Sequence, residues 1–271
     1  TTIDAAQAQQ LQDYAAGIGF VGLDMSTKEG QSAAIAMLYD VDEPESFVQG
    51  IADILAPDGT LILQLNDLYS MVKHTTFDII VHEHLCYYSL TVLEDLITWA
   101  GLAVYRVERN DLNGGSLRLF VCWRGFRLVE RGVYKALNAE QEFITPLALA
   151  QFTIKAVSIA MKVRSFVEAE VARGGRVYVY AASTRGNTLL HAAGLDKTLI
   201  AGAAEIHPEK IGKVMVGTGI PVVAEAEARE KASAFLVLTY SYKSELLERE
   251  AKFLARGGRM CFPMPVFEVV G

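Results

Sequence analysis

The chain has 271 residues, enough for two domains that each bury a hydrophobic core. Hydrophobic residues make up 51% of it and charged residues 21%, which is typical of globular proteins and excludes a disordered chain. The formal net charge of −7 disfavours a general nucleic-acid-binding protein, because binding to phosphates requires a clustered cationic face.

The cysteines and the terminus indicate the cellular compartment. Cys86, Cys122 and Cys261 are too few and too scattered for a disulfide framework or a zinc site made of CxxC pairs. The amino terminus lacks a signal-peptide pattern, and no apolar run approaches the ~18–20 residues that a membrane span requires. We therefore expect a cytoplasmic protein that binds neither nucleic acid nor a membrane, while its oligomeric state stays open.

The first half of the chain is predicted to alternate helices and strands. In chain order we expect a helix over 47–55, a turn and strand within 56–65, a helix over 89–102, and strands over 103–110 and 116–124. Ser89 is the expected N-cap of the second helix and Gly101 its end. The last two strands follow each other directly across the turn 112–115.

The second half begins with a long helical segment. From about Asn138 to Arg173 apolar residues recur at helical spacing, which predicts one long helix or a helix pair, ended by Gly174-Gly175. Beyond it we expect strands over 176–182, 198–205, 234–240 and 259–265 and helices over 186–194 and 243–257. This alternation implies a parallel sheet with crossover helices.

The turn STRGN follows the first of these strands, where a Rossmann unit binds its nucleotide, and Glu205 ends the next strand, where such a unit places its ribose ligand. Only Gly186 stands in the turn, whereas the dinucleotide fingerprint has three glycines. NAD binding, another nucleotide or sugar contact, and a purely structural turn all stay open. Arg185 and Asn187 are either ligands of a phosphate or sugar hydroxyl, or a solvated cation and a helix cap.

A second glycine-bearing turn, LNGGSLR at 112–118, offers groups for an anionic ligand. A glycine pair allows backbone to approach a ligand, Ser116 carries a hydroxyl, and Arg118 is a forked donor suited to carboxylate or phosphate. Alternatively, Gly114-Gly115 is simply a hairpin turn.

The segment FDIIVHEHLCYYSL places His82, Glu83 and His84 after an apolar, strand-like run. In an extended strand the two histidines share one face and the glutamate lies on the other, whereas a turn after Val81 lets all three converge. A metal site is an alternative, but the segment is not an HExxH motif and no third ligand lies nearby in sequence. Burial of three ionisable groups would be costly, which favours a functional role.

Four motifs together resemble the S-adenosylmethionine-dependent sugar C-methyltransferases, which act on nucleotide-linked deoxyketosugars. They are FDIIVHEHLCYYSLTVLEDLITWAGL, VERNDLNGGSLRLFV, VYVYAASTRGNTLL and HPEKIGKVMVGTGIPV, within roughly 47–270. The resemblance implies an α/β fold with a partial class I methyltransferase-like domain over 1–130, a helical bridge over 131–174 and a Rossmann-like carboxy-terminal domain over 175–271.

The resemblance also implies roles for individual residues. His84 would be the base that removes the proton next to the ketone, with Glu83 as its carboxylate partner and His82 in a supporting place. Asn113 replaces the usual histidine of the family, and Arg185 replaces a lysine. The implied substrate-binding residues are Tyr87, Ser89, Asn113, Gly115, Ser116, Arg118, Arg185, Gly186 and Asn187.

The front of the chain departs from this resemblance. The family begins with a cysteine-rich zinc domain and a Gly-rich loop for S-adenosylmethionine, and this sequence has neither. The nearest run, GIGFVGLDM at 17–25, does not read as a strand that feeds a Gly-rich turn. We therefore predict no cofactor-binding residue and no metal ligand, and expect a truncated chain, a chain with segments left out, or a degenerate homologue.

Three functions follow from these patterns. The first is C-methylation of a nucleotide-linked deoxyketosugar by S-adenosylmethionine, with His84 as the base. The second is an inactive homologue that binds a nucleotide-sugar. The third is an NAD-dependent oxidoreductase built on the carboxy-terminal strand-helix-strand unit.

Overall fold

The computed structural model describes residues 31–35, 37–111 and 114–271 of the protein. Contacts divide the chain into two compact units. The first comprises the chain up to Lys73 and His82–Ala148, and the second comprises His74–Val81 and Leu149–Gly271. The chain thus enters the second unit for one short segment, residues 74–81, and then returns to the first.

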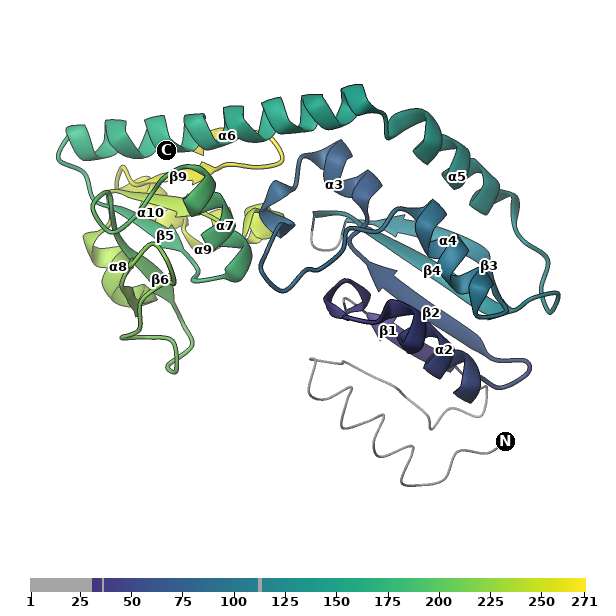
Figure 1. The fold of residues 1–271 in the computed structure, drawn as a ribbon. Coiled ribbons are helices and arrows are strands. Elements are labelled where there is room, and N and C mark those ends of the chain that lie inside the picture. Colours follow the sequence, from purple (N-terminus) through teal and green to yellow (C-terminus); the bar gives the residue numbers. More distant parts are fainter. Residues whose placement is uncertain (1–30, 36, 112–113) are drawn as a thin grey trace. The chain divides into compact units, whose positions relative to one another are not determined.

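The first unit contains a four-stranded mixed sheet in the order β1-β2-β4-β3 (Figure 1). β1 and β2 are parallel, whereas β4 runs antiparallel to both β2 and β3. The strands are β1 (Gln31–Ile35), β2 (Thr60–Leu65), β3 (Leu102–Asn110) and β4 (Ser116–Trp123). The helices are α2 (Pro44–Ile54), α3 (Leu68–His74), α4 (Leu90–Trp99) and α5 (Arg131–Phe143), with a short 3₁₀ turn, η1 (Leu38–Asp40).

α4 shows how the sequence dictates this unit. Leu90, Leu93 and Ile97 recur at helical spacing and are fully buried in the hydrophobic core of the unit. Ser89 caps the helix by accepting a hydrogen bond from the Val92 amide at 3.2 Å, as predicted. The chain then turns at Gly101, whose φ of 79° favours glycine, so both predicted ends of the helix are confirmed.

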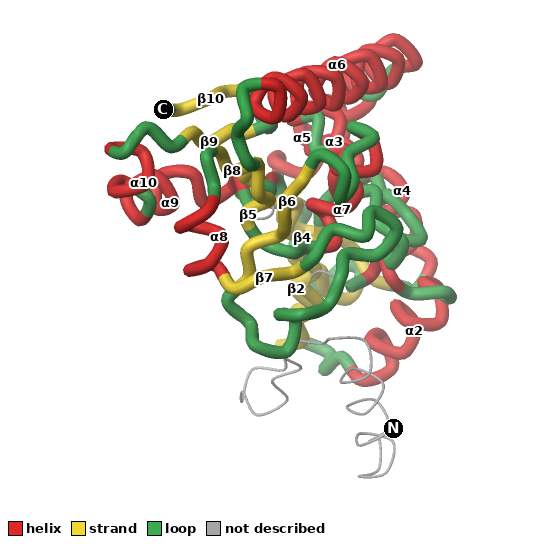
Figure 2. The backbone as a smooth tube through the Cα atoms, turned by 90° about the vertical axis from the view of Figure 1, so that its left-hand side faces the viewer, coloured by secondary structure: helices red, strands yellow, loops and turns green. Residues whose placement is uncertain are grey.

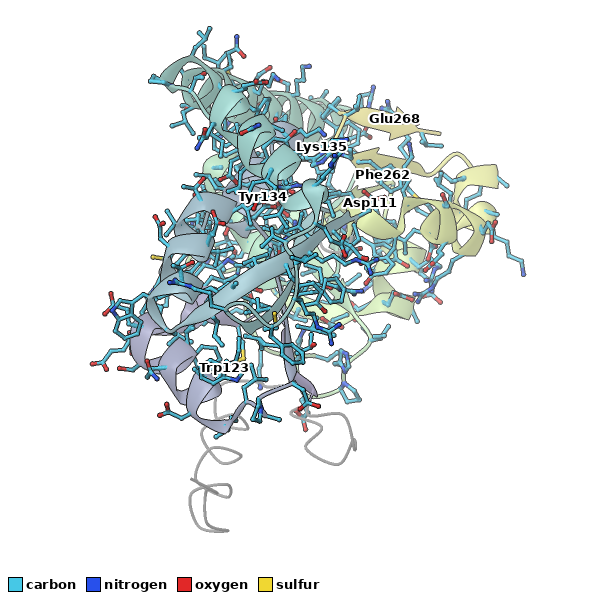
Figure 3. All side chains as sticks on the ribbon, turned by 90° about the vertical axis from the view of Figure 1, so that its right-hand side faces the viewer. Asp111, Trp123, Tyr134, Lys135, Phe262 and Glu268 are labelled. Atoms are coloured by element: carbon cyan, nitrogen blue, oxygen red, sulfur yellow. The ribbon has the colours of Figure 1, made fainter. Side chains whose placement is uncertain are left out.

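Trp123 ties the end of β4 to the end of α2 (Figure 3). Its indole nitrogen donates to the carbonyl oxygens of Leu55 and Ala56, at 3.3 and 3.1 Å. These two carbonyls follow the last turn of α2, where helix carbonyls lack partners within the helix. The side chain therefore satisfies the backbone at the predicted turn before β2.

The second unit contains a six-stranded sheet in the order β10-β9-β8-β5-β6-β7 (Figure 2). All neighbouring strands are parallel except β10, which pairs antiparallel with β9. The strands are β5 (Val177–Tyr180), β6 (Ile200–Glu205), β7 (Val222–Ala224), β8 (Ala234–Val237), β9 (Arg259–Phe262) and β10 (Glu268–Val270). The predicted parallel sheet is confirmed.

The helices of the second unit differ from the prediction in two places: a helix over Glu225–Lys231 was not predicted, and the helix predicted over 243–257 is divided. They are α6 (Pro146–Ala172), α7 (Thr184–Ala192), α8 (Glu225–Lys231), α9 (Lys243–Arg249) and α10 (Ala251–Ala255), with a 3₁₀ turn, η4 (Tyr240–Tyr242), and η2 (Phe77–Ile79) from the inserted segment. The prediction of a single helix over 243–257 is wrong, because the helix is interrupted at Glu250, between α9 and α10. The buried Glu250 carboxylate there accepts hydrogen bonds from Tyr180 and Arg229, at 2.9 and 2.8 Å.

The predicted helical bridge is a helix pair. Residues Ile144 and Thr145 separate α5 from α6, and Pro146 begins α6, where its missing amide proton costs nothing. The Thr145 hydroxyl accepts a hydrogen bond from the Ala148 amide at 3.2 Å and so satisfies an amide of the first turn.

α6 has one buried and one exposed apolar face. Ile159, Val163 and Val167 pack into the core of the second unit, whereas Ile154 and Met161 are 68% and 66% exposed. By length and composition alone, α6 is the one described helix that is apolar enough to cross a membrane. The expectation that no segment reaches that limit is therefore wrong, although a core helix of a soluble protein passes the same test.

Candidate active site

The segment that carries the Glu-His pair is a loop. Phe77–Ile79 forms the 3₁₀ turn η2 instead of the predicted strand-like run. A turn follows at His82–Glu83, and the chain stays irregular until α4 begins. The extended-strand alternative is thus wrong, and the alternative of a turn after Val81 is confirmed.

Burial in this loop differs from the expectation. His82 and Glu83 are exposed, and only His84 is partly buried. The premise that all three ionisable groups are buried is therefore wrong, because two of them are exposed to water, and the cost of burial no longer supports a functional role. The case for function has to come from the surroundings of His84.

His84 lies between two tyrosines of the first unit. Its ring centroid is 4.0 Å from that of Tyr39 and 6.1 Å from that of Tyr87. The backbone fixes the first of these contacts, because the Leu85 amide donates to the Tyr39 carbonyl oxygen at 2.7 Å. Tyr87 was predicted from its motif, whereas Tyr39 was missed because no pattern marks it and it precedes His84 by 45 residues.

Asp40, next to Tyr39, was also missed. Burial, and then the negative charge of Glu83, raise the pKa of the Asp40 carboxyl to about 6. Its Oδ1 atom is buried and has no hydrogen-bond partner among the described residues. Glu83, the neighbour of His84 in sequence, thus interacts electrostatically with a second carboxyl group of the first unit.

The raised pKa of Asp40 predicts a dependence of stability on pH. An acid that binds its proton more tightly in the folded chain stabilises it most below pH 3.8, and this stability is lost as the pH rises through about 6. Asp40→Asn should therefore be more stable than the wild type above pH 7. Since each pKa unit corresponds to about 1.4 kcal/mol and Asp40 is only partly buried, we expect roughly 1.5 kcal/mol.

Urea denaturation at pH 4 and at pH 7.5 measures this difference, which should be much smaller at the lower pH. Asp42→Asn is the matched control, since Asp42 is exposed two residues away and should show no such dependence. Equal stability of Asp40→Asn and wild type at both pH values would contradict the proposed burial of the charge.

The predicted residues of the 112–118 turn are held by side chains from the end of β2. The Asn66 side-chain amide donates to the Gly115 carbonyl oxygen at 2.6 Å, and Arg118 Nε donates to Gln64 Oε1 at 2.7 Å. Ser116 is buried at the start of β4. Gly115 has a φ of 123°, which only glycine adopts readily, so the turn also has the structural role considered above. Asn113 lies outside the described residues.

A buried glutamate closes the other end of the His84 loop. Glu140, on α5, is 2% exposed, and its carboxylate accepts hydrogen bonds from the amides of Leu90 and Thr91 at 2.8 and 3.0 Å. The Thr91 hydroxyl donates to it as well, at 3.0 Å. The amides belong to the first turn of α4, where a negative charge is favourable. Ser89, predicted to bind substrate, serves the same helix start as its N-cap.

The residues predicted in the second unit lie at the start of α7. Ser183 caps this helix by accepting a hydrogen bond from the Gly186 amide at 3.1 Å. A Cβ atom on Gly186 would lie 2.4 Å from Leu238 Cδ1, so close packing alone requires this glycine. The Asn187 side-chain amide donates to the Val216 carbonyl oxygen at 3.0 Å. Arg185 pairs with Asp78 of the inserted segment, and the ion-pair distance is 2.7 Å.

Glu205 ends β6 as predicted, but its carboxylate already accepts hydrogen bonds from other groups of the protein. The amides of Ile206 and His207 donate to Oε1, and Lys210 Nζ lies 3.2 Å from Oε2. Burial raises the pKa of Glu205, but these hydrogen bonds outweigh burial and lower it overall. A ribose hydroxyl would have to compete with them, which weakens the case for NAD binding.

The predicted residues therefore form two sets in two units. His84, Tyr87, Ser89, Gly115, Ser116 and Arg118 belong to the first unit, whereas Arg185, Gly186 and Asn187 belong to the second. Within the described ranges, no group of three or more histidine, cysteine, aspartate or glutamate side chains is arranged to hold a metal ion.

Comparisons with known proteins agree on one kind of chemistry. The profile of a family described as "C-methyltransferase C-terminal domain" matches residues 111–265. The C-methyltransferase NovU of Streptomyces niveus is 30% identical over 260 residues, which are 92% of this chain and 61% of NovU. The chain thus spans less than two thirds of the length of this curated relative.

Solved structures give a weaker likeness. One is the O-methyltransferase NcsB1 from neocarzinostatin biosynthesis, in complex with S-adenosyl-L-homocysteine and 1,4-dihydroxy-2-naphthoic acid. It is 16% identical, with a TM-score of 0.26, over 44% of this chain and 38% of that chain. NcsB1 in complex with S-adenosylmethionine and 2-hydroxy-5-methyl naphthoic acid covers the same shares at 19% identity and a TM-score of 0.28. These TM-scores are too low to establish a common fold.

Proposed function

Because the chain belongs to the C-methyltransferase family, whose carboxy-terminal domain profile matches residues 111–265, we propose that it methylates a carbon atom next to a ketone. The substrate is a nucleotide-linked deoxyketosugar, and S-adenosylmethionine is the methyl donor. One observation carries the assignment of a base: His84 lies on a loop, partly buried, with its ring packed on Tyr39 at 4.0 Å.

The chemistry requires a base of this kind. A ketone acidifies the hydrogen on the neighbouring carbon, and an imidazole, which titrates near neutral pH, is suited to remove it. The face of Tyr39 against the ring favours the imidazolium that forms, because an aromatic face attracts a cation. Glu83 is the proposed carboxylate partner of the base, and its negative charge would favour the same imidazolium.

When bound, S-adenosylmethionine would supply an electrophilic methyl group: the sugar carbon would bond to it as the methyl–sulfur bond breaks and S-adenosylhomocysteine leaves. In the described part of the first unit, the connection from β2 to α3 has no glycine and the one from β4 to α5 has a single glycine, Gly125, so neither is a Gly-rich loop. We therefore assign no residue to the binding of this donor. The proposed roles are limited to the substrate side of the reaction.

The proposed sugar contacts in the first unit lie on the hairpin between β3 and β4. Arg118 is a forked donor held in place by Gln64, and Ser116 offers a hydroxyl at the start of β4. In the second unit, Asn187 has a buried side-chain oxygen without a hydrogen-bond partner among the described residues. A nucleotide or sugar hydroxyl would satisfy this oxygen.

Two assays on the purified full-length protein test the proposal. The first measures transfer of the labelled methyl group of S-adenosylmethionine to a panel of thymidine-diphosphate ketosugars. The second, without donor, follows exchange of the sugar hydrogen next to the ketone in D₂O by NMR. We expect both reactions with at least one sugar.

The outcomes separate the proposal from its alternatives. Binding of a nucleotide-sugar in calorimetry with neither transfer nor exchange would identify an inactive binding homologue. Reduction of NAD on incubation with a nucleotide-sugar would identify an oxidoreductase. Either result would overturn the proposed methylation.

A further inference from the structure

Three polar side chains form a closed network in the second unit. The Asp78 carboxylate accepts a hydrogen bond from Arg185 Nε at 2.9 Å and from the Tyr240 hydroxyl at 3.0 Å. Arg185 Nη2 lies 2.8 Å from the Tyr240 hydroxyl oxygen, so that each member contacts both others. Asp78 and Tyr240 are buried, which makes the network costly to break.

The network joins parts of the chain that are far apart in sequence. Asp78 lies in η2, Arg185 lies in the first turn of α7, and Tyr240 begins η4 after β8. Burial and the neighbouring carboxylate raise the pKa of Tyr240, so its hydroxyl keeps its proton and donates to Asp78. The hydroxyl and the guanidinium thus hold one carboxylate from two elements.

Further contacts hold the same inserted segment. Phe77 is buried in the hydrophobic core of the second unit, and the Thr188 hydroxyl of α7 donates to the Ile80 carbonyl oxygen at 3.1 Å. Residues 77–80 are therefore fixed to the second unit by a buried ring, an ion pair and a backbone acceptor. The next residues of the chain, from His82 on, belong to the first unit and carry the Glu-His pair.

We propose that Asp78, Arg185 and Tyr240 are positioning residues that fix the start of the loop bearing Glu83 and His84. This inference rests on the proposed function, and it gives Arg185 a role other than the predicted contact with substrate. Asp78 precedes Glu83 by only five residues. With so short a connection, a displacement of Asp78 would also displace Glu83 and His84. A base must be held within about 0.5 Å of its productive position, so release of this anchor would slow proton removal.

Tyr240→Phe is the sharpest test, because it removes one hydroxyl and leaves the ring and the ion pair in place. We expect kcat for methyl transfer to fall by about 10-fold, with both KM values within about twofold of wild type. Tyr242→Phe is the matched control: Tyr242 lies in the same 3₁₀ turn, is 58% exposed, and should leave the kinetics unchanged.

A second measurement does not depend on activity. Amide hydrogen exchange, followed by mass spectrometry, should be faster in peptides covering residues 74–89 of Tyr240→Phe than of wild type, and unchanged in Tyr242→Phe. Asp78→Asn should accelerate it further. Arg185→Lys should exchange at a rate between those of wild type and Asp78→Asn, since lysine keeps the positive charge but lacks the planar guanidinium.

These experiments distinguish failure of the proposed anchoring from failure of the proposed methyl transfer. If wild type transfers no methyl group, the exchange experiment still reports whether the network anchors the segment. Wild-type exchange over residues 74–89 together with wild-type kcat in Tyr240→Phe would overturn the inference. A fall in kcat that merely follows a loss of folded protein, measured by circular dichroism, would overturn it as well.

Discussion

Replacement of His84 by alanine is expected to lower the rate of methyl transfer by about 10²- to 10⁴-fold, the usual contribution of a general base. The binding of substrate should change little, because the reason for the loss is proton removal. Exchange of the sugar hydrogen in D₂O should fall by a similar factor, since it depends on the same step and needs no methyl donor.

His82→Ala is the matched control for this experiment. His82 lies two residues away on the same loop and is exposed, and its supporting place does not include removal of the proton. A His84→Ala enzyme that exchanges the hydrogen as fast as wild type would show that another group is the base. If His82→Ala lost activity instead, the roles of the two histidines would have to be reversed.

The second large effect concerns stability. Glu140→Ala should lower the free energy of unfolding by about 2–4 kcal/mol, because hydrogen bonds to a charged group contribute about 1.5–3 kcal/mol. The substitution leaves the buried amide of Leu90 and the partly buried amide of Thr91 without this acceptor. Glu140→Gln should cost less, since one carbonyl oxygen remains to accept. Urea denaturation measures both changes.

The control for Glu140 is a neighbour on the same helix. Glu142→Ala removes an exposed carboxylate from α5 and should change stability by less than about 0.5 kcal/mol. Equal effects at the two positions would mean that the contact of Glu140 with Leu90 and Thr91 adds nothing to the fold.

Local pattern predicted much of the fold. Apolar spacing, the Ser89 cap and Gly101 together located α4, and alternation located β3 and β4, because both signals arise from residues close in sequence. The same signals failed at η2, where an apolar run is too short to distinguish a strand from a 3₁₀ turn. They also failed at Glu250, whose contacts with Tyr180 and Arg229 come from distant elements.

The candidate site was predicted only where motifs marked it. Glu83, His84 and Tyr87 stand in one motif, but the groups around them come from elsewhere in the chain: Tyr39 through a ring contact and Glu140 through backbone amides. Arg185 was predicted either to bind a phosphate or sugar hydroxyl or to be a solvated cation, and the family resemblance favoured contact with the substrate. Its partner is Asp78, 107 residues earlier, and no pattern in one sequence reveals such a pair.

The inserted segment decides how this protein can be divided. A fragment of residues 149–271 produced alone would lack Phe77, and its hydrophobic core would contain a cavity in place of this ring. Arg185 would lose its carboxylate in the same fragment. A fragment ending at residue 148 would carry Phe77 and Asp78 without their partners and expose an apolar ring to water. Cutting the chain at the middle of its length therefore damages both halves, whereas a peptide of residues 74–81 added to the second fragment should restore it.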